Sequence, residues 1–235
     1  MWRFAVLGVL AVLLAGCGER LPTYRYKLTV EVDTPEGVRT GSAVREVRSG
    51  ISGSIPAPGS VRRAVAGEAV AVDLPNGETL FALLIEDQSL EKSPRILTAD
   101  AGHVAQYVFM DRIKTEPGFV GGSEAYKSYV AALSTRTYRA EVPRQFYPQL
   151  VRFDDITDPT SVEAVDADDL SASFGEGYAL RRIVVETTDE TVTRNIEEWL
   201  KWLPRIYELG IGSEFNPEGI PIGDFRGLFT KGDDK

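Results

Sequence analysis

Residues 24–33 (YRYKLTVEVD) decide the fold class of this chain of 235 residues. Every second residue from Leu28 to Val32 is apolar and the residues between them are polar, which is the pattern of a strand with one buried face. Residues 34–37 (TPEG) follow as a turn, because Pro fixes φ and Gly accepts a positive φ. The pattern therefore predicts a hairpin whose return strand is residues 38–47.

A second hairpin is predicted downstream by the same criteria. Residues 68–74 and 79–86 are rich in apolar side chains, and residues 75–78 (PNGE) between them contain the Asn-Gly turn signal. Residues 49–60 (SGISGSIPAPGS), which separate the two hairpins, are predicted to be a loop because Gly, Ser and Pro dominate them. Further along the chain, we expect two more strands, at residues 150–153 and 178–187.

Helices are predicted in the second half of the chain. Residues 123–133 place apolar side chains on one stripe, with Ser123 as a candidate N-cap. Residues 193–208 read as an amphipathic helix, although Pro204 is expected to kink or end it. The pattern at residues 101–113 fits a helix and a strand equally well.

Together these elements predict an α+β fold that is rich in β structure, with antiparallel hairpins and a few helices packed on the sheet. We expect a single globular domain over residues 24–209, because the sequence shows no internal repeat and no long linker. Residues 210–235 are rich in Gly and Pro, and we interpret them as a tail that is either an ordered wrap or a loose end.

The composition excludes several classes of function. The chain has 26 basic and 35 acidic side chains, a net charge of -9, one Cys and one His. A single Cys excludes an internal disulfide framework, and one Cys with one His excludes the common zinc sites. The acidic net charge also argues against a nucleic-acid binder, which would normally show a basic face. We therefore expect no cofactor and no nucleic-acid partner.

The first sixteen residues are typical of a secretory signal peptide. Arg3 is followed by an apolar segment from Phe4 to Ala15. A helix of that length spans about 18 Å, which is too short for a hydrocarbon core of about 30 Å. The segment is therefore expected to direct export and then to be removed.

The end of this segment, Leu14-Ala15-Gly16-Cys17, resembles the lipobox of bacterial lipoproteins. The resemblance implies cleavage before Cys17 and attachment of diacylglyceryl and acyl chains, such as palmitate, to that residue. Residues 17–23 then become the lipidated cysteine and a short tether. Because Gly18 and not Asp follows the cysteine, the resemblance implies an outer-membrane location facing the periplasm. We expect the acidic body to be repelled by anionic headgroups, so that the lipid alone anchors it.

A second resemblance lies within the body of the chain. Residues 147–193 (YPQLVRFDDITDPTSVEAVDADDLSASFGEGYALRRIVVETTDETVT) resemble a segment found in uncharacterised bacterial proteins, some of them membrane-associated. The resemblance implies no activity and no catalytic residue.

Acidic side chains are the remaining candidates for chemistry. Spaced carboxylates can bind Ca²⁺, and the weak candidates for such a site are Asp154, Asp155, Asp158, Asp166 and Asp168. The alternative interpretation is helix capping. Asp158 before Pro159 has the pattern of an N-cap, and Asp166 or Asp168 would cap a turn that begins at Leu170.

Other candidate sites have a structural alternative. His103 has no Ser nucleophile in a G-x-S-x-G context, so we expect it to lie on the surface or in a loop. Trp199, Trp202 and Tyr207 could form a sugar platform, but their helical spacing favours a place in the core. Residues 121–123 (GGS) could receive an anion at a helix N-terminus.

The sequence therefore favours binding or scaffolding over catalysis, with the membrane and an envelope protein as expected partners. Two alternatives stay open. One is an envelope hydrolase that uses carboxylates. The other is a carrier with a ligand cavity between the sheet and the helix at Ile196.

Overall fold

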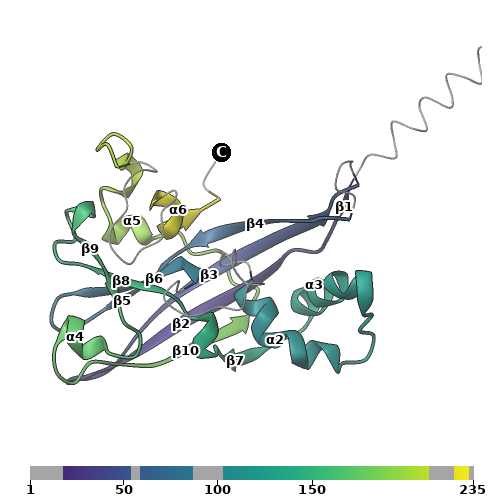
Figure 1. Ribbon diagram of the computed structural model, residues 1–235, viewed down its shortest axis with the longest axis horizontal. Helices are drawn as coiled ribbons and strands as arrows, with labels where there is room; N and C mark the ends of the chain where they lie inside the picture. The colour runs from purple at the N-terminus through teal and green to yellow at the C-terminus, as the bar shows by residue number, and fades with distance from the viewer. Residues whose placement is uncertain (1–17, 54–58, 87–102, 212–224, 233–235) are drawn as a thin grey trace, which may run out of the picture.

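The computed structural model describes residues 18–53, 59–86, 103–211 and 225–232. Antiparallel sheet dominates this part of the chain, and a few helices pack on the sheets (Figure 1). The predicted class, α+β and rich in β structure, is confirmed. None of the described helices is long and apolar enough to cross a membrane.

A seven-stranded sheet forms the long body of the molecule (Figure 1). Its strands follow the order β11-β4-β3-β2-β10-β7, and β1 pairs with β3 beyond the start of β2. The strands are β1 (Glu19–Arg20), β2 (Tyr24–Thr34), β3 (Gly37–Ile51), β4 (Val61–Glu68), β7 (Arg139–Glu141), β10 (Ala179–Thr187) and β11 (Thr230–Lys231).

The hairpin predicted from residues 24–47 is confirmed as β2 and β3. Thr34 pairs with Gly37 across a two-residue turn, and Gly37 has a φ of 113°, which a residue with a side chain rarely adopts. The return strand is longer than predicted. Residues 49–51, expected in a loop, continue β3 because their backbone groups pair with β4, and backbone pairing does not require apolar side chains.

A smaller sheet of four strands has the order β5-β6-β8-β9. Its strands are β5 (Val70–Asp73), β6 (Thr79–Glu86), β8 (Pro148–Phe153) and β9 (Val162–Val165). The second predicted hairpin is confirmed as β5 and β6, but Glu68 belongs to β4 instead of the first arm. The strands at residues 150–153 and 178–187 are also confirmed, as β8 and β10. Strands β1, β4, β7, β9 and β11 were not among the predicted strands.

Short helices connect and cover the sheets. They are α2 (Val104–Lys114), α3 (Ala125–Thr135), α4 (Leu170–Phe174), α5 (Ile196–Trp199) and α6 (Phe225–Phe229). The undecided segment at residues 101–113 is helical where the structure describes it. The helix predicted at residues 123–133 is confirmed, but Ser123 is not its cap. It lies in the 3₁₀ turn η1 (Gly122–Glu124), and α3 begins after Glu124.

The single helix predicted over residues 193–208 is wrong. The chain forms α5, which has four residues, and then the 3₁₀ turn η4 (Leu203–Arg205). Pro204 lacks an N–H and its ring would collide with the carbonyl of Leu200 in a continuous helix, so Leu200 leaves the helical conformation. The apolar spacing still has its effect, because Leu200 and Leu203 are fully buried.

Most of the core that the structure describes forms two apolar layers, one on each face of the small sheet, and Val65 and Leu84 form a small separate cluster. On one face, the small sheet, helices α2 and α3 and the inward residues of β2, such as Tyr26 and Val30, form one cluster. The opposite face packs against α5, η4 and α6 in a second cluster. The two sheets approach closely at Gly41 of β3, where an added Cβ would lie 2.0 Å from the carbonyl oxygen of Ala71.

The other face of the large sheet is polar and charged. Along β2, Lys27 pairs with Glu186 of β10 at 3.1 Å, Glu31 with Arg182 at 2.9 Å and Asp33 with Arg181 at 3.1 Å. These cross-strand ion pairs make this face polar, and β2 presents no apolar stripe on it.

Candidate functional site

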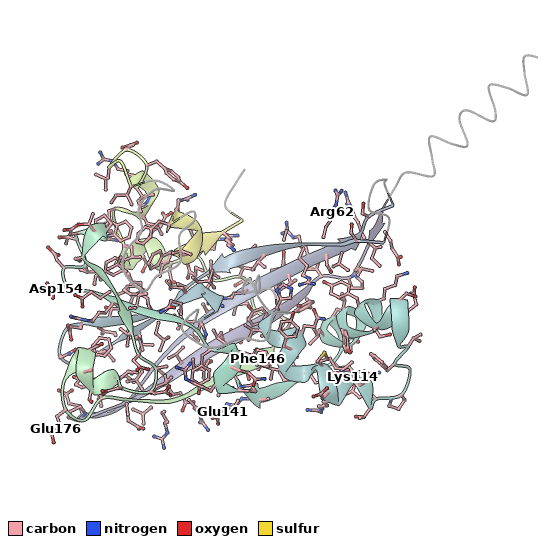
Figure 2. The ribbon with its side chains drawn as sticks, viewed as in Figure 1. Arg62, Lys114, Glu141, Phe146, Asp154 and Glu176 are labelled. Atoms are coloured by element: carbon pink, nitrogen blue, oxygen red, sulfur yellow. The ribbon has the colours of Figure 1, made fainter. Side chains whose placement is uncertain are left out.

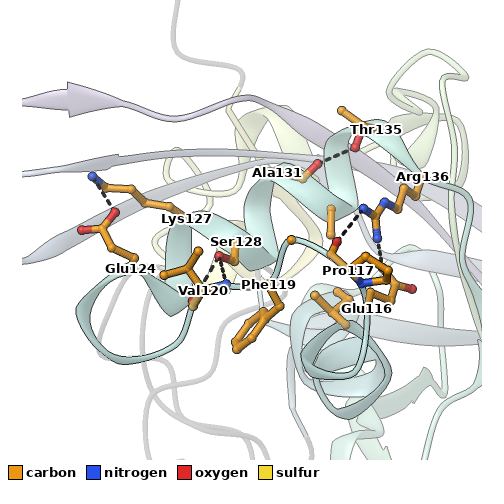
Figure 3. Close-up of a pocket in the computed structure, with 13 residues that line it drawn as sticks. Glu116, Pro117, Phe119, Val120, Glu124, Lys127, Ser128, Ala131, Thr135 and Arg136 are labelled. Carbon is orange, nitrogen blue, oxygen red and sulfur yellow. Dashed lines mark hydrogen bonds and ion pairs between the residues drawn. The ribbon is translucent and has the colours of Figure 1, made fainter.

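A hollow lies beside α3. It has a volume of about 430 Å³ and is bounded by α3 and by the segment that joins α2 to η1 (Figure 3). The Ser128 hydroxyl holds this segment in place, because it accepts from the Val120 N–H at 3.0 Å and donates to the Val120 carbonyl at 3.1 Å. Small residues of α3, Ala131 and Ala132, keep the hollow open.

An ionised carboxylate lies at one end of this hollow. The Tyr138 hydroxyl donates to Glu116 at 2.7 Å, and Arg136 forms an ion pair with the same carboxylate. These contacts, first the Tyr138 hydrogen bond and then Arg136, hold the pKa of Glu116 below its ordinary value. Burial and the bond to Glu116 raise the pKa of Tyr138. Glu116 is therefore a fixed anion and is poorly suited to donate a proton.

The other polar side chains around the hollow are also engaged. Lys127 Nζ lies 2.7 Å from Glu19 and 3.0 Å from Glu124. The Thr135 hydroxyl donates to the carbonyl of Ala131 at 2.7 Å. A nucleophile needs an adjacent base, and the hydroxyls lining this hollow instead bond to backbone groups. The arrangement can bind a ligand with an apolar body, and it offers no reactive constellation among the described residues.

The five candidate metal ligands lie in turns and do not converge. Asp155 accepts from the Thr157 N–H at 2.9 Å, and Asp158 accepts from the Thr160 N–H at 2.8 Å. Asp166 accepts from the Asp168 N–H at 2.9 Å. Within the residues that the structure describes, no three His, Cys, Asp or Glu side chains are placed to hold a metal ion.

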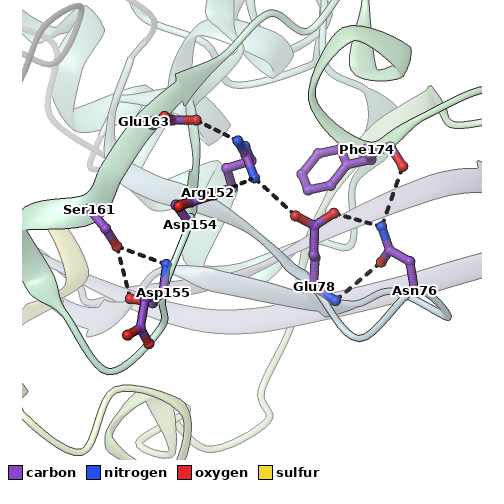
Figure 4. Close-up of polar contacts among 8 residues, drawn as sticks. All are labelled: Asn76, Glu78, Arg152, Asp154, Asp155, Ser161, Glu163 and Phe174. Carbon is purple, nitrogen blue, oxygen red and sulfur yellow. Dashed lines mark hydrogen bonds and ion pairs between the residues drawn. The ribbon is translucent and has the colours of Figure 1, made fainter.

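Asp168 and Asp154 pair with arginines. Asp168 forms a two-pronged contact with Arg144 at 3.0 to 3.1 Å. Arg152 contacts Glu78 at 2.9 Å, Glu163 at 2.6 Å and Asp154 at 3.8 Å (Figure 4). Its guanidinium group therefore occupies the place that a metal ion bound by these acids would take. A hollow of about 270 Å³ is bordered by Glu78 and Asp154, which contact Arg152, and by Asp155, whose carboxylate accepts from Thr157.

The capping predictions have mixed outcomes. Asp158 caps the 3₁₀ turn η3 (Pro159–Ser161), with Pro159 following it, as predicted. The turn beginning at Leu170 is confirmed as α4, but the prediction that Asp166 or Asp168 caps it is wrong. Asp169 is the N-cap, because its carboxylate accepts from the Ala172 N–H and from the Ser171 hydroxyl. An N-cap side chain bonds to the N–H of the second or third helical residue, and only Asp169, which directly precedes Leu170, is close enough to do so.

The remaining candidates lie apart from one another. His103 precedes α2, and its ring stacks on Tyr107 with centroids 5.3 Å apart. Trp202 is buried beside Phe153 and Phe225 and donates from Nε1 to the carbonyl of Ile156 at 2.8 Å. Tyr207 is 57% exposed. Trp199 is partly buried against the cluster that contains Trp202. A shared sugar platform of Trp199, Trp202 and Tyr207 is therefore not formed, and the core interpretation holds for Trp202.

The segment proposed to bind an anion through residues 121–123 forms the start of η1, a turn of three residues. The carrier alternative requires a cavity between the sheet and the helix at Ile196. The hollow described there is about 200 Å³ and, besides Ile196, is bordered by Glu68, Arg194, Glu197 and Thr230. These side chains are polar, whereas a carrier of apolar ligands needs a mostly apolar lining.

Arg45 and Glu68 are buried polar residues that were not among the predicted site residues. Arg45 is 1% exposed and donates from Nε to the carbonyl of Glu68 at 3.1 Å. The Glu68 carboxylate, 2% exposed, accepts from the N–H groups of Asn195 and Ile196 at 2.8 Å. The signal was available, because Arg45 occupies an inward position in the alternation of β3. The role of this pair is structural: it joins β3, β4 and the start of α5.

Cys17 and the signal segment lie outside the described residues. The first described residues, Gly18 to Arg20, run beside the end of β3 at one end of the large sheet (Figure 1). Searches of protein-family models, of curated proteins and of solved structures found no match to this chain.

Proposed function

We propose that this chain is a lipid-anchored protein of the bacterial cell envelope, that Cys17 carries the lipid, and that its body binds or scaffolds a partner. The observation that carries the proposal is the sequence Leu14-Ala15-Gly16-Cys17 after a short apolar segment. Several acyl chains anchor stably, because each buried CH₂ contributes about 0.8 kcal/mol. Gly18 after the cysteine favours the outer membrane.

The position of residues 18–20 supports this proposal. They lie at one end of the elongated sheet, so an anchor one residue earlier would hold the body by that end (Figure 1). The hollow beside α3 supports a binding role, because its polar side chains already have ion pairs or backbone hydrogen bonds and its small residues leave open space. An envelope protein or a ligand with an apolar body is the partner class that fits it.

The test is the substitution Cys17→Ser in the cell that makes the protein. We expect the variant to leave the membrane fraction or to accumulate as an uncleaved precursor, because the thiol that takes the diacylglyceryl group is missing. The measurements are membrane fractionation and the mass of the N-terminal peptide.

A matched control restores the thiol elsewhere. Thr191→Cys places a cysteine at an exposed site, and in the Cys17→Ser background it should not restore anchoring. Unchanged fractionation and processing of the Cys17→Ser variant would show that the lipobox interpretation is wrong.

A further inference from the structure

The end of the large sheet nearest residue 18 presents two arginines on one face. Arg20 of β1 pairs with Gly50 of β3, and Gly50 pairs on its other side with Arg62 of β4. Residues directly opposite one another on neighbouring strands project to the same face. The two arginine side chains therefore flank a position that has no side chain, and Figure 2 shows Arg62 at this end of the molecule.

These arginines differ from the others on the same face. Arg25 and Arg48 both bind the carboxylate of Glu46, at 2.7 and 2.6 Å. In contrast, Arg20 and Arg62 are exposed, and neither side chain has a hydrogen bond or an ion pair within the described ranges. Their charges are available to an anion from outside the chain.

Both arginines line a hollow of about 310 Å³ at this end of the sheet. It is lined by Arg20, Arg62 and small residues that include Gly18, Gly50 and Ser52. Larger residues would disturb it, because a Cβ on Gly50 would lie 2.9 Å from the carbonyl oxygen of Glu19. The one acid at the hollow, Glu19, is bound by Lys127 at 2.7 Å and so does not neutralise the arginines.

We propose that Arg20 and Arg62 bind the phosphate of an anionic lipid headgroup in the membrane that holds the chain. A guanidinium presents paired N–H donors that match phosphate oxygens, and two of them can share one phosphate above Gly50. The inference rests on the proposed function, because a lipid on Cys17 brings the headgroup layer within one residue of Gly18.

This contact orients the molecule. The chain as a whole is acidic, with a net charge of -9, so an anionic surface repels most of it and attracts this end. Strand β3 has 15 residues and spans about 50 Å at the usual rise of a strand. With the arginine end on the headgroups, the β2–β3 turn at the opposite end points away from the membrane.

The test measures the chemical reactivity of arginines in the chain purified from cells and inserted into lipid nanodiscs. One set of discs contains phosphatidylcholine alone, and the other also contains phosphatidylglycerol. We expect an arginine-modifying dicarbonyl reagent to modify Arg20 and Arg62 about fivefold more slowly in the anionic discs, which corresponds to ~1 kcal/mol per arginine near an anionic surface. Arg39 and Arg205 serve as internal controls.

Matched variants test whether the two arginines act together. Arg62→Gln should raise the modification rate of Arg20 in anionic discs to its rate in phosphatidylcholine discs. Arg181→Gln removes an exposed arginine near the opposite end of the sheet and should leave the rate of Arg20 unchanged.

Three other outcomes would contradict the headgroup contact, the lipid anchor or both. Equal rates in both discs with a lipid on Cys17 would overturn the headgroup contact and leave the anchor intact. Equal protection by inorganic phosphate in phosphatidylcholine discs would identify a site for free phosphate and also overturn it. An unmodified Cys17 in the N-terminal peptide would overturn both the anchor and the contact.

Discussion

Glu46 and Glu68 are two buried glutamates whose pKa values are shifted in opposite directions. Both are at most 5% exposed. Burial raises the pKa of Glu68, and the N–H groups of Asn195 and Ile196 only partly offset that effect, so its pKa lies above the ordinary value of 4.5. Burial also acts on Glu46, but Arg25 and Arg48 outweigh it and lower its pKa. The direct ion pairs with Arg25 and Arg48 lower the pKa of Glu46, whereas the charges of Arg194 and Arg45 act on Glu68 too weakly to overcome its burial.

These shifts predict opposite effects of pH on stability. A depressed pKa means that Glu46 contributes stability above pH 4.5, which is lost as the pH falls through its folded-state pKa. A raised pKa means that the contribution of Glu68 is present below pH 4.5 and is lost as the pH rises through its folded-state pKa.

Glutamine substitutions at the two positions check this prediction, and each serves as the control for the other. The free energy of unfolding lost in Glu46→Gln should be larger at about pH 7 than at about pH 3.5, and for Glu68→Gln the order should reverse. Urea unfolding at both pH values measures the losses. The same trend in both variants would contradict the assigned shifts.

At the scale of an element, helix α4 depends on one carboxylate. The Asp169 side chain accepts from the Ala172 N–H at 3.2 Å and from the Ser171 hydroxyl at 2.5 Å. These bonds fix the start of a helix that buries Leu170 and Phe174 in the core. The helix has only five residues, so its own backbone bonds cannot maintain it.

We therefore expect Asp169→Ala to lower the free energy of unfolding by about 1 kcal/mol, the usual value of an N-cap. Asp154→Ala is the control, because that exposed carboxylate has only a 3.8 Å contact with Arg152. The control should cost less than about 0.5 kcal/mol. Equal losses in denaturant unfolding would rule out the capping role of Asp169.

At the scale of the whole molecule, residues near the C-terminus complete the second core cluster. Phe229 of α6 is fully buried and packs against Phe81, Phe153 and Trp202, with ring centroids 5.8 to 6.2 Å apart. Strand β11 then pairs with β4 at the edge of the large sheet. Where the structure describes the segment after residue 209, it is therefore part of the folded body.

Phe229→Ala should cost about 3–5 kcal/mol of unfolding free energy, because it removes a large side chain and leaves a cavity between packed rings. Leu209→Ala is the control, since Leu209 is 52% exposed, and its loss should stay within about 0.5 kcal/mol. Thermal or urea unfolding of the two variants compares them. A small loss at Phe229 would mean that α6 contributes little to the second cluster.

The sequence by itself determined the elements whose signals are local. Alternation in β2, the Asn-Gly turn before β6 and the cap at Asp158 depend on residues a few positions apart, so the class of fold and the hairpins followed from them. The lipobox is likewise a contiguous pattern, and the proposed anchor depends on it alone.

Tertiary structure decided everything that joins distant residues. Arg45 and Glu68 are 23 positions apart, and Glu68 meets Ile196 across 128 positions. The row of Arg20, Gly50 and Arg62 exists only because three strands align in register. The sequence around a charged residue does not indicate which backbone group or charge will contact it, because the order of the strands and the packing of the two sheets determine those distances.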